Sequence, residues 1–333
     1  MVKGTFIDTL LYEPSYGWKD KNDELVVPTK KQLFAEAFSR INIFKTKKNW
    51  ISFVSFLMLV GMLPFFYLFL VKYFSWYLMI AVVVYAMVIM GTHGTIWLHR
   101  YCTHKSYGFS NPIWRIITQN LVIKTVPEEI YVVSHHVHHC KSDEPGDPYN
   151  PQAGLWYCML AEYNHQRVSP DLSEEAYQKA ARFMKHTGVK INSYKQYQKW
   201  GSIASPAYTV ATWVLNWSIW YLILFLIGGP ALACAIFSAA MLWFALIRAF
   251  NYTGHGGGKE NTATASTLID PTFLSISPDP DCSQGNGIIT TTCFPEAPGP
   301  VFFPVNWIWP GSIFTRYENS DSLPGTRIQS RNS

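Results

Sequence analysis

Long segments without charged side chains constrain the fold of this chain more than any other feature. Residues 201–247 contain no Asp, Glu, Lys or Arg, and the same is true of residues 51–71 and 73–98. A helix needs about 20 apolar residues to cross the hydrocarbon core of a bilayer. Each of the two shorter segments is long enough for one such helix, and the longest is long enough for two. We therefore predict an all-α membrane protein with four transmembrane helices.

The predicted spans pair into two hairpins with short turns. One hairpin turns near Lys72, and the other turns at Gly228, Gly229 and Pro230, where glycine and proline interrupt the helix. The residues between the two hairpins, 99–200, predict a helical cap. The expected spans cover about residues 50–72, 75–98, 203–227 and 230–250.

Charged residues are few and unevenly distributed. They make up 15% of the chain, against about 25% in soluble domains. Nine lysines and arginines lie in residues 1–50 and twelve in residues 99–200, whereas the turns between paired spans hold only Lys72. By the positive-inside rule, we expect the N-terminal segment 1–49, the cap and the C-terminal region to face the cytoplasm. The net charge of +5 suits contact with anionic membrane lipid or an acidic electron carrier, and the basic residues form no compact stripe for nucleic acid.

Four of the ten histidines crowd into the stretch HHVHH at residues 135–139. Imidazoles this close repel one another when protonated, and a metal ion is the usual reason for keeping them neutral. On a helix His135, His138 and His139 share one face, because they are spaced i, i+3 and i+4, whereas His136 points elsewhere. The stretch predicts a site for one or two metal ions, and the alternative is a solvated polar tract.

Other polar residues lie at the same predicted side of the membrane. His99 and His104 are five residues apart at the end of the second span, which is about 140° round an ideal helix. We therefore expect the helix to end between them. Asn251 and His255 are spaced i, i+4 at the end of the fourth span.

The remaining histidines predict no metal site. His93 lies within an apolar span, and we expect it to be packed there. His165 and His186 lie in polar stretches, and we expect them to be solvated.

The candidate ligands suggest the kind of metal. Imidazole-rich sites without thiolate suit zinc, copper, nickel or iron. The candidate histidines are His99, His104, His135, His138, His139 and His255. A single zinc ion needs only three or four ligands, so this set favours two metal ions. Two iron ions that activate O₂ beside a membrane would attack an unactivated C–H bond, and a lipid chain is the nearest substrate.

These residues resemble the histidine motifs of membrane fatty acid desaturases of the acyl-CoA delta-9 type. HRYCTH at 99–104 and HHVHH at 135–139 resemble the first and second histidine boxes. DPYNP at 147–151 resembles the segment after the second box, and NYTGH at 251–255 resembles the asparagine and histidine element. The resemblance covers about residues 35–258.

The resemblance implies a fold and a chemistry. It implies four transmembrane helices under a cytoplasmic cap, with a tunnel for the acyl chain. It also implies two iron ions, O₂ as co-substrate, electrons from cytochrome b5 or a ferredoxin-type donor, and a fatty acyl-CoA or acyl lipid as substrate. By this comparison the six histidines are iron ligands, and Asn251 reaches an iron through water. Asp147, Asn150 and Trp156 are candidates for binding substrate.

The third histidine box of the family, commonly HNxHH, is missing from the chain as written. No histidine follows His255, and residues 259–333 are rich in Pro, Ser and Thr without clear periodicity. Codons for residues 285–310, read two bases further on, permit EWHNNHHLFPGSARAGFLP, one unmatched position, and then QLDLAW. That string resembles the missing box and the segment after it. We infer a slip of reading frame near residues 259–264, and expect an irregular tail and weak or absent activity.

Two other functions stay open from the sequence. A membrane hydroxylase of alkanes, fatty acids or sterols uses similar histidine boxes, but inserts oxygen instead of removing two hydrogens. A non-enzymatic membrane metal-binding protein is favoured if the tail is genuine, and it would hold a single zinc ion.

Overall fold

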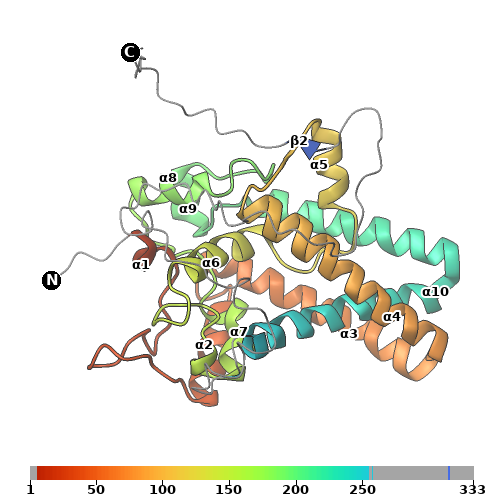
Figure 1. The fold of residues 1–333 in the computed structure, drawn as a ribbon, viewed down its shortest axis with the longest axis horizontal. Helices are drawn as coiled ribbons and strands as arrows, with labels where there is room; N and C mark the ends of the chain where they lie inside the picture. The colour runs from red at the N-terminus through yellow and green to blue at the C-terminus, as the bar shows by residue number, and fades with distance from the viewer. Residues whose placement is uncertain (1–5, 255–256, 258–313, 316–333) are drawn as a thin grey trace, which may run out of the picture.

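The structure, a computed structural model, describes residues 6–254, Gly257 and residues 314–315 (Figure 1). The N-terminal part contains α1 (Phe6–Leu10), α2 (Lys30–Ile41) and η1 (Lys47–Asn49), and the long apolar helices are α3 (Trp50–Lys72), α4 (Trp76–Ile89), η2 (Met90–Thr103) and α10 (Pro206–Gly254). The cap contains α5 (Pro112–Gln119), α6 (Glu128–Cys140), η3 (Pro151–Ala153), α7 (Leu155–Asn164), α8 (Glu174–Arg182) and α9 (Tyr194–Trp200). Strands β1 (Gly108–Phe109) and β2 (Phe314–Thr315) form a short antiparallel pair.

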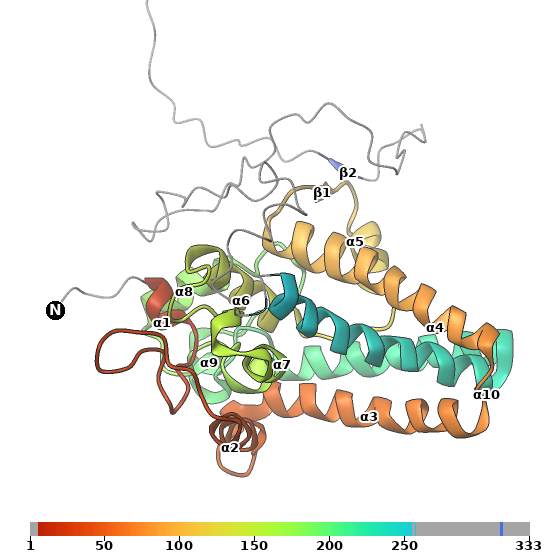
Figure 2. The ribbon, with the colours of Figure 1, turned by 60° about the horizontal axis from the view of Figure 1, so that its bottom comes forward.

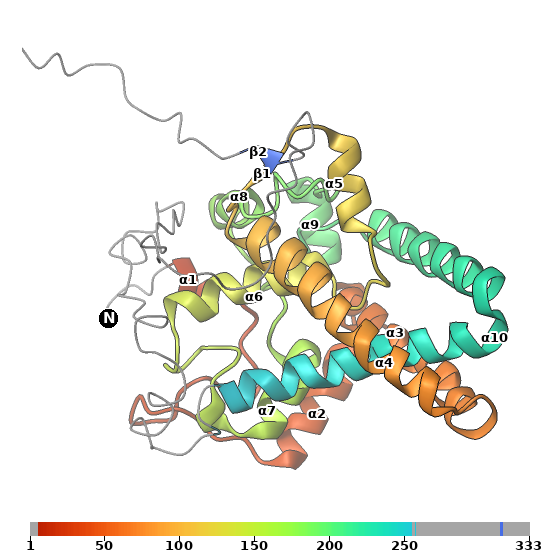
Figure 3. The ribbon, with the colours of Figure 1, turned by 45° about the vertical axis from the view of Figure 1, so that its right-hand side comes forward.

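The protein is an all-α membrane protein, as predicted. Three helical segments are long and apolar enough to cross a membrane, namely Lys47–Lys72, Trp76–Thr103 and Pro206–Gly254. The third is not one straight helix, because Gly228 and Gly229 leave helical geometry and α10 doubles back there (Figure 3). The predicted glycine turn is therefore confirmed, and the three segments contain four helical rods. The predicted tail at 259–333 lies outside the described residues, apart from β2.

The rods lie side by side, and the cap covers one end of them (Figures 1 and 2). Their outward side chains are apolar and uncovered: Tyr67, Ile80 and Leu215 are each at least 60% exposed. A soluble helix normally turns polar residues outward, so this surface fits contact with lipid. The rods thus hold the cap against the membrane surface.

The turn within α10 depends on Gly229. Its φ of 64° and ψ of −167° belong to a region that is almost restricted to glycine, although a Cβ there would meet nothing within 4 Å. We expect Gly229→Ala to destabilise the hairpin by about 1–3 kcal/mol, through backbone strain alone. A lower thermal unfolding midpoint in detergent would show this. Gly91→Ala, at a helical position with equally open space, is the control and should leave the midpoint unchanged or raise it.

The segment that leads into α6 is fastened to α10. The Asn216 side chain accepts from the Lys124 amide at 3.0 Å and donates to the Val122 carbonyl at 3.1 Å, and the Trp217 indole donates to the Lys124 carbonyl at 3.0 Å. The Lys124 ammonium, itself buried, lies 3.2 Å from the Glu128 carboxylate in the first turn of α6. Non-helical backbone beside lipid must find such partners within the protein. These contacts fix where α6 starts.

A buried ion pair ties the cap to the rods. Glu162 of α7 binds Arg248 of α10 and Ser55 of α3 through its two carboxylate oxygens. Arg248 also donates to the Met159 carbonyl at 2.8 Å. A buried charge that loses its partner is costly, so these three helices keep one relative position. The end of α10 is therefore held beside the cap.

Candidate metal centre

A π-helix brings His99 and His104 together. η2 continues the second rod with wider turns, and the His104 amide donates to the His99 carbonyl at 3.0 Å, an i→i+5 hydrogen bond. This winding puts residues five apart on one face, and the two ring centroids lie 4.5 Å apart. The helix ends at Thr103, between the two histidines as predicted, but the π winding that brings their rings together was not predicted.

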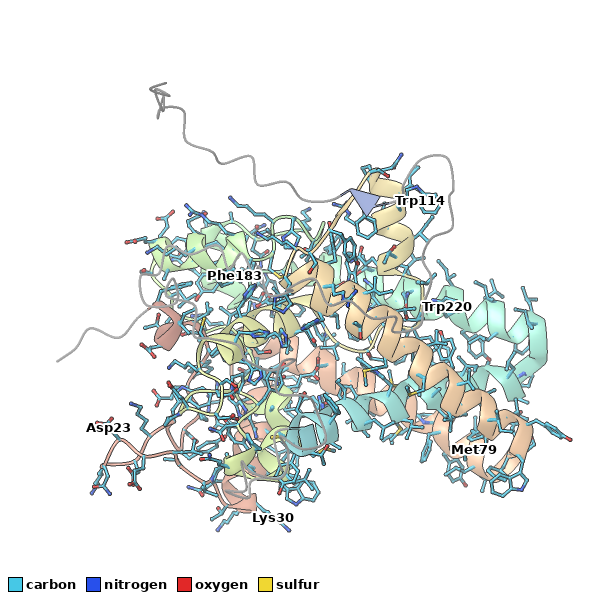
Figure 4. The ribbon with its side chains drawn as sticks, viewed as in Figure 1. Asp23, Lys30, Met79, Trp114, Phe183 and Trp220 are labelled. Atoms are coloured by element: carbon cyan, nitrogen blue, oxygen red, sulfur yellow. The ribbon has the colours of Figure 1, made fainter. Side chains whose placement is uncertain are left out.

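The second group of histidines lies on α6. This helix begins with Glu128 and Glu129, whose negative charges suit the positive end of a helix. His135 and His139 lie one turn apart, with their Nε2 atoms separated by 3.1 Å. His136 is buried on another side, where its ring stacks on Phe183 at 4.3 Å between centroids. Figure 4 labels Phe183. The predicted division of this cluster into two faces is confirmed for these residues.

Four histidines from the two helices converge on one point. One ring nitrogen from each of His99, His104, His135 and His139 lies within 4.8 Å of all the others. The His135 ring is central, with its centroid 4.9 Å from that of His99 and 4.6 Å from that of His139. All four side chains are half-buried. The first and second histidine motifs therefore form one site.

The geometry of this cluster fits a shared metal ion. Metal–nitrogen bonds of about 2.0–2.1 Å place neighbouring ligand nitrogens about 3 Å apart. The 3.1 Å between the Nε2 atoms of His135 and His139 matches that spacing. Among the described residues the cluster contains imidazoles alone, which suits zinc, copper, nickel or iron.

Burial and crowding keep these imidazoles neutral. Burial, followed by the neighbouring His99 and His139, lowers the pKa of His104 to about 3. Burial, followed by His138 and His99, lowers the pKa of His139 to about 4. Burial, followed by the neighbouring His139 and His99, holds the pKa of His135 well below its usual value. Because neutral imidazole is the form that binds metal, the ligands are ready at neutral pH.

His138 does not join the four-histidine cluster, and Asp147 holds its ring. The Nδ1 atom of His138 lies 2.9 Å from Oδ1 of Asp147, whose side chain has no solvent exposure. The same carboxylate accepts from the backbone amides of Asp143 at 2.9 Å and Tyr149 at 2.8 Å. A carboxylate on one ring nitrogen fixes the orientation of the ring and aims the other nitrogen. Asp147 is therefore a positioning residue for His138.

The other two candidates for substrate binding have different surroundings. Asn150 is fully buried, accepts from the Gln152 amide at 2.9 Å and donates to the Glu144 carbonyl at 3.2 Å, so it shapes the loop. Trp156 is 41% exposed on α7 and lies 6.0 Å from Phe34 between ring centroids. Substrate binding by Asp147, Asn150 and Trp156 stays a prediction.

The Asp147 carboxylate also stabilises the loop after α6, because it accepts from two backbone amides. We expect Asp147→Ala to lower the thermal unfolding midpoint, because the Tyr149 amide loses its acceptor in a buried place and the Asp143 amide loses its acceptor in a partly buried one. Each such loss costs about 1–3 kcal/mol. Asp147→Asn keeps one acceptor oxygen and should lose clearly less. Fluorescence-detected melting of the two variants in detergent measures the difference, and equal losses would contradict this role.

The structure corrects the predicted solvent exposure of two of the remaining histidines. His93 is packed, as predicted, with 1% exposure. His165 was expected to be solvated, but it is fully buried and its Nε2 lies 3.0 Å from the Pro148 carbonyl. His186 is half-buried, and its Nε2 lies 2.9 Å from the Tyr101 carbonyl. Both predictions failed because polar stretches of the cap fold inward and brace the loops around the site.

Two tyrosines beside the histidines were missed by sequence reasoning. Tyr131 stacks on His135, with centroids 5.1 Å apart. Tyr149 meets His138 edge-on at 5.2 Å, and its hydroxyl lies 2.9 Å from that of Ser134. Tyr131 precedes His135 by four residues, so helical spacing could have found it. Nothing in the sequence indicates that the loop would return Tyr149 to α6.

The asparagine and histidine element is only partly described. Asn251 lies half-buried in the last turn of α10, and this end of the helix lies beside α7 (Figure 2). His255 lies outside the described residues. Metal binding by these two residues stays a prediction.

The fold and the site define a class of protein, an integral membrane protein with a cluster of histidines that could hold a metal ion. The chain belongs to the fatty acid desaturase family, whose sequence model matches residues 74–277. That region includes the π-helix, α6 and all of α10. No curated protein and no solved structure matches the chain significantly.

Proposed function

We propose that this chain derives from a membrane-bound diiron desaturase that introduces a double bond into a fatty acyl chain. The convergence of His99, His104, His135 and His139 in a member of the desaturase family is the observation that carries the proposal. The resemblance favours the delta-9 type, with a fatty acyl-CoA or an acyl lipid as substrate. Cytochrome b5 or a ferredoxin-type protein is the proposed electron donor.

The proposed reaction removes two hydrogens from neighbouring carbons of the acyl chain. One O₂, two electrons from the donor protein and two protons are consumed, and the products are the double bond and two waters. When bound, a pair of iron ions supplies the activation of O₂ that this step requires.

The side chains of this chain would hold and orient the two metal ions. The neutral rings of the four-histidine cluster offer their nitrogens to one ion, and the π-helix sets the spacing of His99 and His104. Asp147 aims the ring of His138, which we assign to the second ion. His255, Asn251 and the missing third histidine box would complete that second site.

We also propose an orientation in the membrane. The cap and the N-terminus face the cytoplasm, because the lysines and arginines gather there and the hairpin turns nearly lack them. A reduced electron donor would then reach the metal centre from the cytoplasmic side.

In this exact chain we propose that the activity is impaired. The third box appears only when the codons of residues 285–310 are read in another frame, so the chain as written lacks those ligands. The domain arrangement that follows is a desaturase-like region at 50–258 and an aberrant tail at 259–333.

One observation favours a second candidate. Four histidines are enough for a single tetrahedral zinc ion without any contribution from the tail. A non-enzymatic metal-binding membrane protein would therefore need nothing more than the cluster already described.

Lipid analysis tests the proposed function. The frame-restored gene is expressed in a host that lacks unsaturated lipids, and the fatty acids are examined by mass spectrometry. A loss of two hydrogens supports the desaturase. A gain of one oxygen would instead identify a hydroxylase, and unchanged lipids with a bound zinc ion would favour the metal-binding protein.

A further inference from the structure

The helix before the first rod has its polarity partly reversed, although Leu33 and Ala37 are also buried and Lys30 and Lys31 are exposed. α2 buries the charged residues Glu36 and Arg40, which are 5% and 4% exposed. It exposes Phe34 and Phe38, which are 41% and 65% exposed. In water a helix turns its charges outward and its aromatic residues inward. The pattern of α2 therefore indicates that its outer face does not meet water.

The buried face of α2 explains why this orientation is stable. Thr29 and Gln32 form a capping box that starts the helix, and Arg40 binds Glu36 inside the protein. The Arg40 guanidinium also stacks on Tyr12 at 3.4 Å from the ring centroid. Because Arg40 and Glu36 make these contacts inside the protein, α2 cannot rotate to hide its phenylalanines without breaking the contacts.

The exposed aromatic residues continue toward the membrane-spanning segment. Phe44 is 97% exposed in the turn after α2, and the apolar segment that spans the membrane begins at Lys47. α2 itself lies across the start of α3 and not along it (Figures 2 and 3). A helix in this position lies in the plane of the membrane surface, next to the lipid-facing side of α3.

Lysines surround these aromatic residues. We define the α2 surface as Lys30, Lys31, Phe34, Phe38, Phe44, Lys45, Lys47 and Trp156. Lys30 lies over the Trp156 ring at 5.6 Å from its centroid, and Phe34 contacts the same ring. The only acidic residue between positions 27 and 48 is the buried Glu36. The surface therefore combines apolar rings with unopposed positive charge.

We propose that the α2 surface is an interfacial anchor that binds anionic lipid headgroups in the leaflet next to the cap. The phenylalanine rings enter the boundary of the acyl chains, and the lysines contact headgroup phosphates. An acidic partner protein would satisfy the lysines, but it would leave the reversed polarity of α2 and its continuity with α3 unexplained. The anchor holds α7, and with it the loop of the metal centre, at a fixed depth.

Spin labels on the full chain in lipid vesicles test this proposal. A nitroxide amino acid replaces Phe38, and the same label at Asp23 and Tyr67 gives the two references. Asp23, in the N-terminal segment, lies at the far end of the molecule from Met79 (Figure 4), and its side chain is 87% exposed. Tyr67 lies on α3 and is 65% exposed. We expect the ratio of collisions with O₂ to collisions with a water-soluble nickel chelate at position 38 to approach the value at position 67. A ratio like that at position 23 would overturn the proposal, and shielding from both reagents would assign the surface to a protein partner or a second copy.

A second comparison isolates the charge. In vesicles with phosphatidylglycerol, Lys30→Gln with Lys31→Gln should lower the collision ratio at position 38, since each lysine at an anionic surface favours binding by about fivefold. Lys185→Gln with Lys195→Gln, two exposed lysines on other parts of the cap, is the matched control and should change nothing. An equal ratio in vesicles of phosphatidylcholine alone and in anionic vesicles would exclude a role for anionic headgroups.

Discussion

His135→Ala is expected to remove the bound metal ion from this chain, with an affinity loss of more than about 100-fold. Even residues that only support a ligand contribute about 10–100-fold to metal affinity, and His135 is a direct ligand in the proposed site. Its ring lies between those of His99 and His139, so its loss opens the centre of the cluster. Metal content after dialysis against a graded series of chelators measures the effect.

The neighbouring His136 provides the control. It lies on the same helix and is more deeply buried, but its ring stacks on Phe183 outside the cluster. His136→Phe preserves an aromatic ring at that position and should retain the metal. If His135→Ala keeps its ion, or if His136→Phe loses it, the assignment of ligands is wrong.

The four helical rods and the two faces of the histidine stretch on α6 could be predicted, because each depends only on a local pattern in the sequence. Uncharged segments of sufficient length have few stable alternatives to membrane helices, and Gly228, Gly229 and Pro230 interrupt any helix that contains them. On α6, spacing alone separates His135 and His139 from His136. Neither inference needs knowledge of what lies nearby in space.

The π-helix could not be predicted in the same way. An ideal α-helix separates His99 and His104 by about 140°, so the sequence suggested a helix end. In the structure a wider helical turn brings the two rings to one face, with the His104 amide donating to the His99 carbonyl. The stability of this winding comes from tertiary contacts, for example the hydroxyl of Tyr101 that donates to the His186 carbonyl at 2.7 Å.

The contacts of the loop residues could not be predicted, for a related reason. Asp147 follows His138 by nine residues, and no helical or strand period relates them. Their contact exists because the loop after α6 turns back, and His165 braces that loop at the Pro148 carbonyl. The same folding buried His165, which had been assigned to solvent. Polar composition therefore indicated a loop correctly, but could not show which polar groups the loop encloses.

The low pKa values of the cluster keep its imidazoles neutral, which is the form that binds a metal ion. Neutral imidazoles gathered in a half-buried site have lost part of their hydration. The Nε2 atoms of His135 and His139 can form only one hydrogen bond with each other. A metal cation coordinated by all four ring nitrogens would compensate for this lost hydration. The cluster therefore implies binding even though the reaction of this chain is still a proposal.

Restoring the reading frame near residues 259–264 is expected to raise the metal content from one ion to two per chain and to restore desaturation. The chain as written has four converging histidines, which we expect to hold one ion. The restored string EWHNNHHLFPG would add three histidines downstream of α10, whose last turns Arg248 and Glu162 hold beside the cap. Iron per chain, measured by elemental analysis of both purified forms, gives the comparison.

A third form controls for the tail itself. Truncation after Gly258 removes every residue of the altered frame and should behave like the chain as written, with one ion and no unsaturated product. If the chain as written binds two ions and desaturates lipid while the truncated form does not, the tail supplies real ligands and the frame slip is refuted. If both short forms hold one ion and only the restored form holds two, the missing ligands belong to the third box, and the four-histidine cluster is half of a larger centre.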